Sequence, residues 1–267
     1  MYAIALFPKS FLQFLKRTQC ARQTCRWPSS VAILLCLLGL GGGVQAGDKL
    51  VLTTGVLAPY TRPDHKGFLD QMIVAVFREA GLEAELQVFS TATARTLLNA
   101  DAGIDDGEAM RIAGLEKQYP NLIRVPETLI SNDFVAYATH VQVATNDWKA
   151  LEPYVVSYMI GWKIFENNVR NAKEVTQVRD ADQLFGLLAN GRTDLALYER
   201  WQGLQRIRDL GLKAHALEPP LARTDMFIYL HKNHEALVPR VAQALARLKA
   251  NGTYKRIFDA TLTSITK

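Results

Sequence analysis

The residues best suited to bind a charged solute are a carboxylate and a guanidinium that stand three residues apart. They are Glu108 and Arg111, within the sequence GIDDGEAMR at residues 103–111. We expect a short strand over 103–106, a turn at Gly107 and a helix over 108–118 that carries both side chains in its first turn. The first turn of a helix offers N–H groups and a positive dipole end, and a guanidinium beside it would hold a carboxylate bidentately. The alternative is that Arg111 pairs with Glu108 on the surface, and the spacing alone does not decide between the two.

Two further places in the chain have residues that could meet a charged group. Gly161 and Trp162 follow an expected strand, where their backbone could bind an anion. The alternative there is an ordinary glycine turn with a packed tryptophan. Glu199 stands at the C-terminal end of another expected strand, the edge at which ligands of open α/β sheets bind, and could accept an ammonium group. A solvated glutamate at a helix start is the alternative for Glu199.

Common catalytic and nucleotide-binding motifs are missing from the sequence. No serine lies in a Gly-x-Ser-x-Gly turn, and no glycine-rich phosphate loop occurs. His231 and His234 are three residues apart and could share a metal ion, but their polar run at an expected strand–helix junction favours a solvated turn. We therefore expect no catalytic residue, no metal and no cofactor.

The elements that must position these residues alternate between strands and helices. Strands are expected over 50–54, 83–89, 103–106, 122–125, 134–138, 154–159, 174–178, 194–198, 213–217 and 226–230. Helices are expected over 69–80, 91–100, 108–118, 163–169, 180–190, 200–210, 235–250 and 257–262. This alternation predicts an α/β fold with mostly parallel sheets.

The basic excess of the chain lies in its first 46 residues. The chain has 267 residues, with 31 Lys and Arg against 26 Asp and Glu, and residues 1–46 hold five of the basic residues, none of the acidic ones and all three cysteines. The apolar run VAILLCLLGL followed by Val44-Gln45-Ala46 has the layout of a cleaved signal peptide, and the run is too short to span a bilayer. Without this segment the chain is neutral and has no cysteine. We therefore expect a protein exported to the periplasm, without disulfides and without electrostatic support for a nucleic-acid partner.

Taken together, the order of these segments resembles the bacterial extracellular solute-binding proteins of family 3, the amino-acid-binding group with the type II periplasmic fold. The resemblance extends over residues 48–259. The motifs that carry it are Ala58-Pro59-Tyr60, Gly67-Phe68, Arg111 after Asp105-Asp106-Gly107, Gly191-Arg192-Thr193-Asp194 and the closing segment 245–257.

This resemblance implies a two-lobed α/β fold. The signal peptide would be residues 1–46, lobe 1 residues 47–138 plus 220–267, and lobe 2 residues 139–219. Each lobe would have a mostly parallel sheet flanked by helices, and two crossing segments would join the lobes. The ligand would lie between the lobes, which close on it.

The resemblance also assigns roles to individual residues. Tyr60 would line the first lobe, Arg111 would bind an α-carboxylate, Gly161 and Trp162 would offer backbone N–H groups from the second lobe, and Glu199 would bind an α-ammonium group. The sequence departs from the family in two places: Glu108 stands where the family has the threonine of Thr-x-x-Arg, and Gly161-Trp162 replaces Gly-Thr. Both departures speak against an ordinary α-amino acid as the ligand.

Three functions are compatible with these features. The favoured one is a monomeric periplasmic binding protein that captures a small polar solute, amino-acid-like or carboxylate, and presents it to an ABC permease or a membrane sensor kinase. A second is a dehydratase-like enzyme on the same fold, with Glu108 as general acid or base. The third is a vestigial domain, for example a non-transport signalling domain, in which Glu108 and Arg111 pair internally and no amino acid binds.

Overall fold

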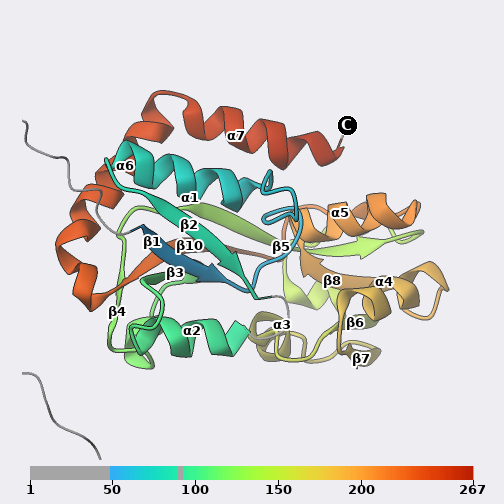
Figure 1. The fold of residues 1–267 in the computed structure, drawn as a ribbon. Coiled ribbons are helices and arrows are strands. Elements are labelled where there is room, and N and C mark those ends of the chain that lie inside the picture. The colour runs from blue at the N-terminus through green and yellow to red at the C-terminus, as the bar shows by residue number, and fades with distance from the viewer. Residues whose placement is uncertain (1–48, 90–92, 267) are drawn as a thin grey trace, which may run out of the picture. The chain divides into compact units, whose positions relative to one another are not determined.

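Strands and helices alternate along the computed structural model, which describes residues 49–89 and 93–266 (Figure 1). The predicted signal peptide and its cysteines lie outside the described residues. The strands are β1 (Leu50–Thr54), β2 (Ala84–Val88), β3 (Gly107–Ile112), β4 (Leu122–Arg124), β5 (Ile130–Ala138), β6 (Val155–Met159), β7 (Glu174–Val178), β8 (Leu195–Glu199), β9 (His215–Ala216) and β10 (Ala222–His231). The α-helices are α1 (Phe68–Glu79), α2 (Thr93–Asp101), α3 (Lys163–Asn168), α4 (Ala181–Ala189), α5 (Arg200–Leu210), α6 (Val238–Ala250) and α7 (Thr253–Thr261). Among the described helices, none is long and apolar enough to cross a membrane.

The described strands form one mixed sheet in the order β2-β1-β3-β10-β5-β8-β6-β7, with β4 beside β10 and β9 beside β5. The pairings β1–β2, β1–β3, β6–β7 and β6–β8 are parallel. In the middle, β10 runs antiparallel to β3 and β5, and β5 runs antiparallel to β8. The predicted α/β alternation is confirmed. The parallel pairings lie towards the two ends of the sheet, because β10 and β5 lie between them and each runs antiparallel to its neighbours.

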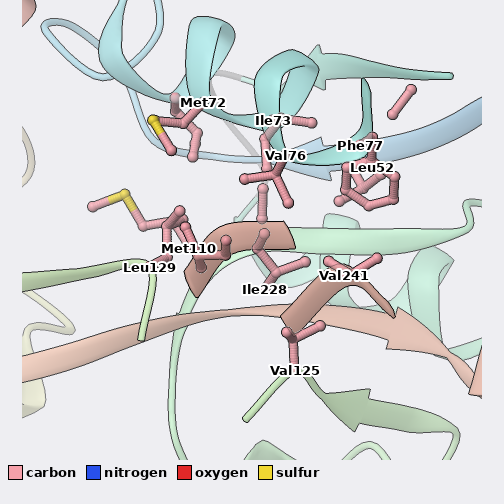
Figure 2. Packing of buried hydrophobic residues seen from close by; sticks show 14 of the residues in the cluster. Leu52, Met72, Ile73, Val76, Phe77, Met110, Val125, Leu129, Ile228 and Val241 are labelled. Carbon is pink, nitrogen blue, oxygen red and sulfur yellow. The ribbon is translucent and has the colours of Figure 1, made fainter. Parts of the chain in front are cut away.

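The first hydrophobic core lies between α1 and the sheet. The periodic apolar residues of α1 are buried and pack with Leu52 of β1 and Ile228 of β10 (Figure 2). Helices α6 and α7 cover the same face beside α1, and α2 contacts β1 and β3 (Figure 1). This core therefore joins the N-terminal strands to the C-terminal helices, and burial of each large apolar side chain contributes roughly 1.5–3 kcal/mol.

The second half of the sheet is covered on both faces. Alternate residues of β5 enter different clusters: Phe134, Ala136 and Ala138 pack in one, and Val135 and Tyr137 pack in the other. This follows from the two-residue period of a strand, which places successive side chains on opposite faces. A strand buried on both faces reads as a continuous apolar run, as VAYA does here.

The structure contradicts the prediction for residues 103–118. The expected strand over 103–106 and helix over 108–118 are both wrong, because residues 107–112 form β3 and only Leu115–Lys117 make a short 3₁₀ helix. Glu, Ala, Met and Arg favour helices, but pairing with β1 on one side and β10 on the other overrides that preference. A Cβ added at Gly107 would overlap the carbonyl oxygen of Tyr229, so glycine permits this close pairing. The helix N-terminus expected to attract an anion at Glu108 therefore does not exist.

The contact between α5 and β5 gives a prediction for the packing of the second half. Gly203 of α5 faces the ring of buried Tyr137, whose hydroxyl donates a hydrogen bond to the carbonyl of Arg200. We expect Gly203→Ala to lower the free energy of unfolding by roughly 1–3 kcal/mol through overpacking. Gly186→Ala in α4 is the control, because its added Cβ meets no atom within 4 Å, and it should stabilise by about 0.4–1 kcal/mol. Urea unfolding measures both values, and equal effects would contradict the close packing of Gly203 on Tyr137.

Candidate functional site

Glu108 and Arg111 form an ion pair on β3. The Nε and Nη2 atoms of Arg111 lie 2.8 Å and 2.6 Å from Oε1 of Glu108. Residues three apart on a regular strand point to opposite faces. Here Arg111 pairs with Phe227 and Glu108 with Tyr229, which are two apart on β10 and hence on one face. A bulge on β3 accounts for the extra residue.

The bulge has a clear local signature in the backbone. Met110 has a positive φ of 68°, the left-handed region that a non-glycine residue seldom occupies. Its side chain is nevertheless buried in the first core. The apolar packing of Met110 thus holds the backbone in the conformation that turns Arg111 back toward Glu108.

The pair is buried and connected to two threonines. The side chain of Glu108 is 0% exposed and that of Arg111 is 15% exposed. Thr53 of β1 donates to Oε2 of Glu108 at 2.9 Å, and Nη2 of Arg111 donates to Thr96 of α2 at 2.9 Å. Burial raises the pKa of Glu108, and the charge of Arg111 opposes that rise. The internal pairing considered for the sequence is present, but it lies within the sheet rather than on the surface.

Tyr60 and Glu199 meet although 139 residues separate them in the sequence. The Tyr60 hydroxyl, in the loop after β1, lies 2.9 Å from Oε1 of Glu199 and 3.0 Å from Oδ1 of Asn132. Tyr60 is fully buried, so it packs inside the protein against Phe68. Burial and the neighbouring Glu199 carboxylate raise the pKa of Tyr60 well above its ordinary value.

Glu199 caps the N-terminus of α5. Its Oε1 accepts a hydrogen bond from the N–H of Trp201 at 3.1 Å, and its Oε2 accepts one from the N–H of Gln202 at 2.9 Å. An acidic side chain suits this position because it satisfies N–H groups and complements the helix dipole. The alternative for Glu199, a solvated glutamate at a helix start, is right about the helix start and wrong about the solvation, because Glu199 is only 1% exposed. Burial raises its pKa to about 7, against the opposing effect of the backbone N–H groups and Tyr60.

Gly161 and Trp162 form a turn with a packed aromatic ring. Gly161 has a φ of 85° and donates its N–H to Oε1 of Glu166 at 2.7 Å. The N–H of Trp162 donates to a main-chain oxygen three residues earlier at 3.3 Å. The Trp162 ring stacks on Phe165 and Tyr198, with centroid distances of 5.7 Å and 4.7 Å. Both N–H groups that were expected to face a ligand thus donate hydrogen bonds to other groups of the chain.

The six predicted site residues therefore lie in three pairs: Glu108 with Arg111, Tyr60 with Glu199, and Gly161 with Trp162. Sequence reasoning missed three partners of these pairs, namely Thr53, Thr96 and Asn132. Thr53 gave a signal, since it is a polar residue within the apolar strand LVLTT. Thr96 and Asn132 gave none, because only the folded chain places them beside Arg111 and Tyr60.

The two histidines proposed and set aside as metal ligands have other contacts. His234 Nε2 lies 2.6 Å from Oδ1 of Asp106, and Nδ1 of His231 accepts the N–H of Asn233. Across residues 49–89 and 93–266, no three His, Cys, Asp or Glu side chains are placed to hold a metal ion together.

Solved structures of three kinds of protein share this fold. The GluR0 ligand-binding core from Nostoc punctiforme, in complex with L-glutamate, is 17% identical and has a TM-score of 0.61 over 79% of this chain and 98% of that chain. A histidine kinase sensor domain with similarity to periplasmic binding proteins is 16% identical, with a TM-score of 0.63 over 80% and 96%. The amino acid ABC transporter substrate-binding protein AbpA from Streptococcus pneumoniae, bound to L-arginine, is 15% identical, with a TM-score of 0.62 over 82% and 96%. The chain therefore has the two-lobed fold of periplasmic binding proteins, as the sequence resemblance implied.

Sequence comparison gives one distant relative. An uncharacterized protein from Shewanella oneidensis is 24% identical over 164 residues, which are 58% of this chain and 62% of that protein. No family model matches the chain.

Proposed function

We propose that this chain is an exported solute-binding protein that captures a small polar solute between two lobes and presents it to a membrane partner. The observation that carries the proposal is the fold, which about 80% of the chain shares with binding cores and a sensor domain. Closure on a solute would favour one conformation and so change the surface that the partner meets. An ABC permease and a sensor kinase are both suitable partners, and the protein would act as a periplasmic monomer.

The hydrophobic clusters in the two halves of the sheet support a division into lobes. We propose lobe 1 as residues 47–138 plus 220–267 and lobe 2 as residues 139–219. The first core contains residues from both segments of lobe 1, for example Leu52 from the first segment and Val241 from the second. Phe134 and the alternate residues of β5 that follow it pack with Leu151 and Val156 of lobe 2. We therefore propose to move the first boundary from residue 138 to a crossing within β5, near Phe134. The second crossing then lies in β10, whose residues 222–226 pair with β5.

The geometry gives less support to an enzyme. A general acid or base must reach its substrate, whereas Glu108 is buried against Thr53 and Arg111. The three solved structures compared above are described as ligand-binding, substrate-binding or sensor proteins. We therefore propose binding without turnover.

A thermal-shift screen of the purified chain tests this function. We expect at least one solute among amino acids, amines, amides and small dicarboxylates to raise the unfolding temperature saturably, because a ligand that binds only the folded state stabilises it, by about 2.7 kcal/mol at a hundred times its Kd. The solute should be recovered unchanged after incubation. Absence of any shift across all four classes would contradict solute binding, and chemical conversion of the solute would favour the enzyme.

A further inference from the structure

We propose that Glu108 is a specificity-determining residue that occupies the Arg111 guanidinium and so keeps solute carboxylates out of the site. The solutes selected would then present a neutral or cationic group at this position. This inference rests on the proposed solute-binding function and specifies the class of solute.

The first step is the geometry of the guanidinium. A solute carboxylate binds arginine best through two parallel N–H donors on one edge of the fork. In this chain Nε and Nη2, which make up one such edge, both lie within 2.8 Å of Glu108 Oε1. The same Nη2 atom also donates to Thr96. Glu108 therefore already stands where a solute carboxylate would bind that edge.

The second step is the anchoring of Glu108. Its strand β3 pairs with Thr53 of β1 on one side and with Tyr229 of β10 on the other. Its carboxylate is fully buried, and the Thr53 hydroxyl holds the second oxygen. This carboxylate cannot reach solvent unless the side chains that cover it, such as Arg111, move aside. A competing solute would thus leave Glu108 buried beside it.

The third step is electrostatic. Two carboxylates on one guanidinium in a buried place repel each other, so one of them must take up a proton or bind weakly. Burial already raises the pKa of Glu108, which shows that this environment disfavours negative charge. Among the other candidate side chains, Glu199 is acidic and its partner Tyr60 brings no positive charge. The candidate side chains therefore carry no surplus positive charge that would attract an anion.

Solutes that differ only in a carboxylate test this inference. L-arginine with its decarboxylated form agmatine, and L-lysine with cadaverine, are titrated by calorimetry into the wild type, Glu108→Thr and Glu108→Gln. We expect the L-amino acids to bind Glu108→Thr at least about tenfold more tightly than the wild type, because the guanidinium edge becomes available for a charge-assisted pair. Agmatine and cadaverine should gain nothing from the substitution. The double variant Glu108→Thr/Arg111→Met should lose the gain.

The outcomes separate the inference from the function on which it rests. Equal affinity of wild type and Glu108→Thr for the L-amino acids would overturn the role of Glu108, even if the wild type binds another solute in the screen. A wild type that binds no solute, combined with an L-amino acid gain in Glu108→Thr, would support the role of Glu108 and contradict the solute-binding function. Glu108→Gln keeps the size of the side chain and removes its charge, so it tests the repulsion between carboxylates if the threonine variant does not fold: the L-amino acids should still gain affinity over the wild type, and no gain would overturn the electrostatic step.

Discussion

Replacing Arg111 with methionine is expected to lower the free energy of unfolding by about 3–5 kcal/mol at neutral pH, the range observed when one partner of a buried ion pair is removed. The reason is that Glu108 stays fully buried on β3, where the hydroxyls of Thr53 and Thr96 are neutral partners that do not balance its charge. Urea unfolding followed by circular dichroism measures the loss. Arg247→Met is a matched control, because Arg247 pairs with Glu79 while half exposed, and its loss should stay below about 1 kcal/mol.

A second substitution shows whether the Glu108 carboxylate, left without Arg111, causes this loss of unfolding free energy. Glu108→Gln in the Arg111→Met background removes that charge, so the double variant should be more stable than Arg111→Met alone. Lowering the pH should also raise the free energy of unfolding of the Arg111→Met variant. An acid whose pKa is raised in the folded state binds a proton there before the unfolded chain does, so its contribution to stability grows as pH falls toward the unfolded pKa. If neither pH nor Glu108→Gln changes the loss of stability in Arg111→Met, the buried charge of Glu108 is not its cause.

Replacing Glu199 with glutamine is expected to change the pH dependence of stability. The pKa of Glu199 rises from its ordinary value of 4.5 to about 7 in the folded protein. Between these values only the folded state holds the proton, so the contribution of Glu199 to stability falls as pH rises from 4.5 to 7 and stays low above that. At 1.36 kcal/mol per unit, the difference amounts to about 3 kcal/mol. Glutamine imitates the protonated carboxyl and should remove this slope.

The measurement compares unfolding free energies of the wild type and Glu199→Gln between pH 4.5 and pH 8. Relative to the wild type, the variant should gain stability steadily as pH rises to about 7. Glu166→Gln is the control, because the pKa of Glu166 is lowered by Lys163 and by the N–H of Gly161. The stabilising contribution of Glu166 is lost only as pH falls below about 4.5, so the curves of the wild type and Glu166→Gln should run nearly parallel from pH 4.5 to pH 8. Parallel curves for the wild type and Glu199→Gln would contradict the raised pKa of Glu199.

Local periodicity predicts the fold well where one face of an element meets a core. The apolar spacing of residues 69–80 predicts α1, and the structure buries that face against β1 and β10. The cap at Asp180 likewise predicts α4, since its side chain accepts the N–H of Gln183. Residues 107–112 behave differently. Their residue types favour a helix, and they form β3 only because they pair with β1 and β10, which lie far from them in the sequence.

In the candidate site too, some features follow from neighbouring residues and others depend on residues far apart in the chain. Trp162 lies packed in a glycine turn, which its immediate neighbours already indicated. The contact between Tyr60 and Glu199 depends on a tyrosine and a carboxylate far apart in the chain, and no short spacing encodes it. The internal pairing of Glu108 with Arg111 was one of two alternatives from the sequence, but its burial depends on the mistaken helix being a strand.

The bulge at Met110 makes chain length as important as residue identity for the charges on β3. Residues at this three-residue spacing on a regular strand, with no bulge between them, would occupy opposite faces of the sheet. A related sequence that keeps the three-residue spacing but forms a regular strand would therefore lose the pair, whereas one with a single residue between the glutamate and the arginine would place both on one face without a bulge. Alignments of divergent relatives should accordingly be judged by the spacing of this segment before its letters are compared.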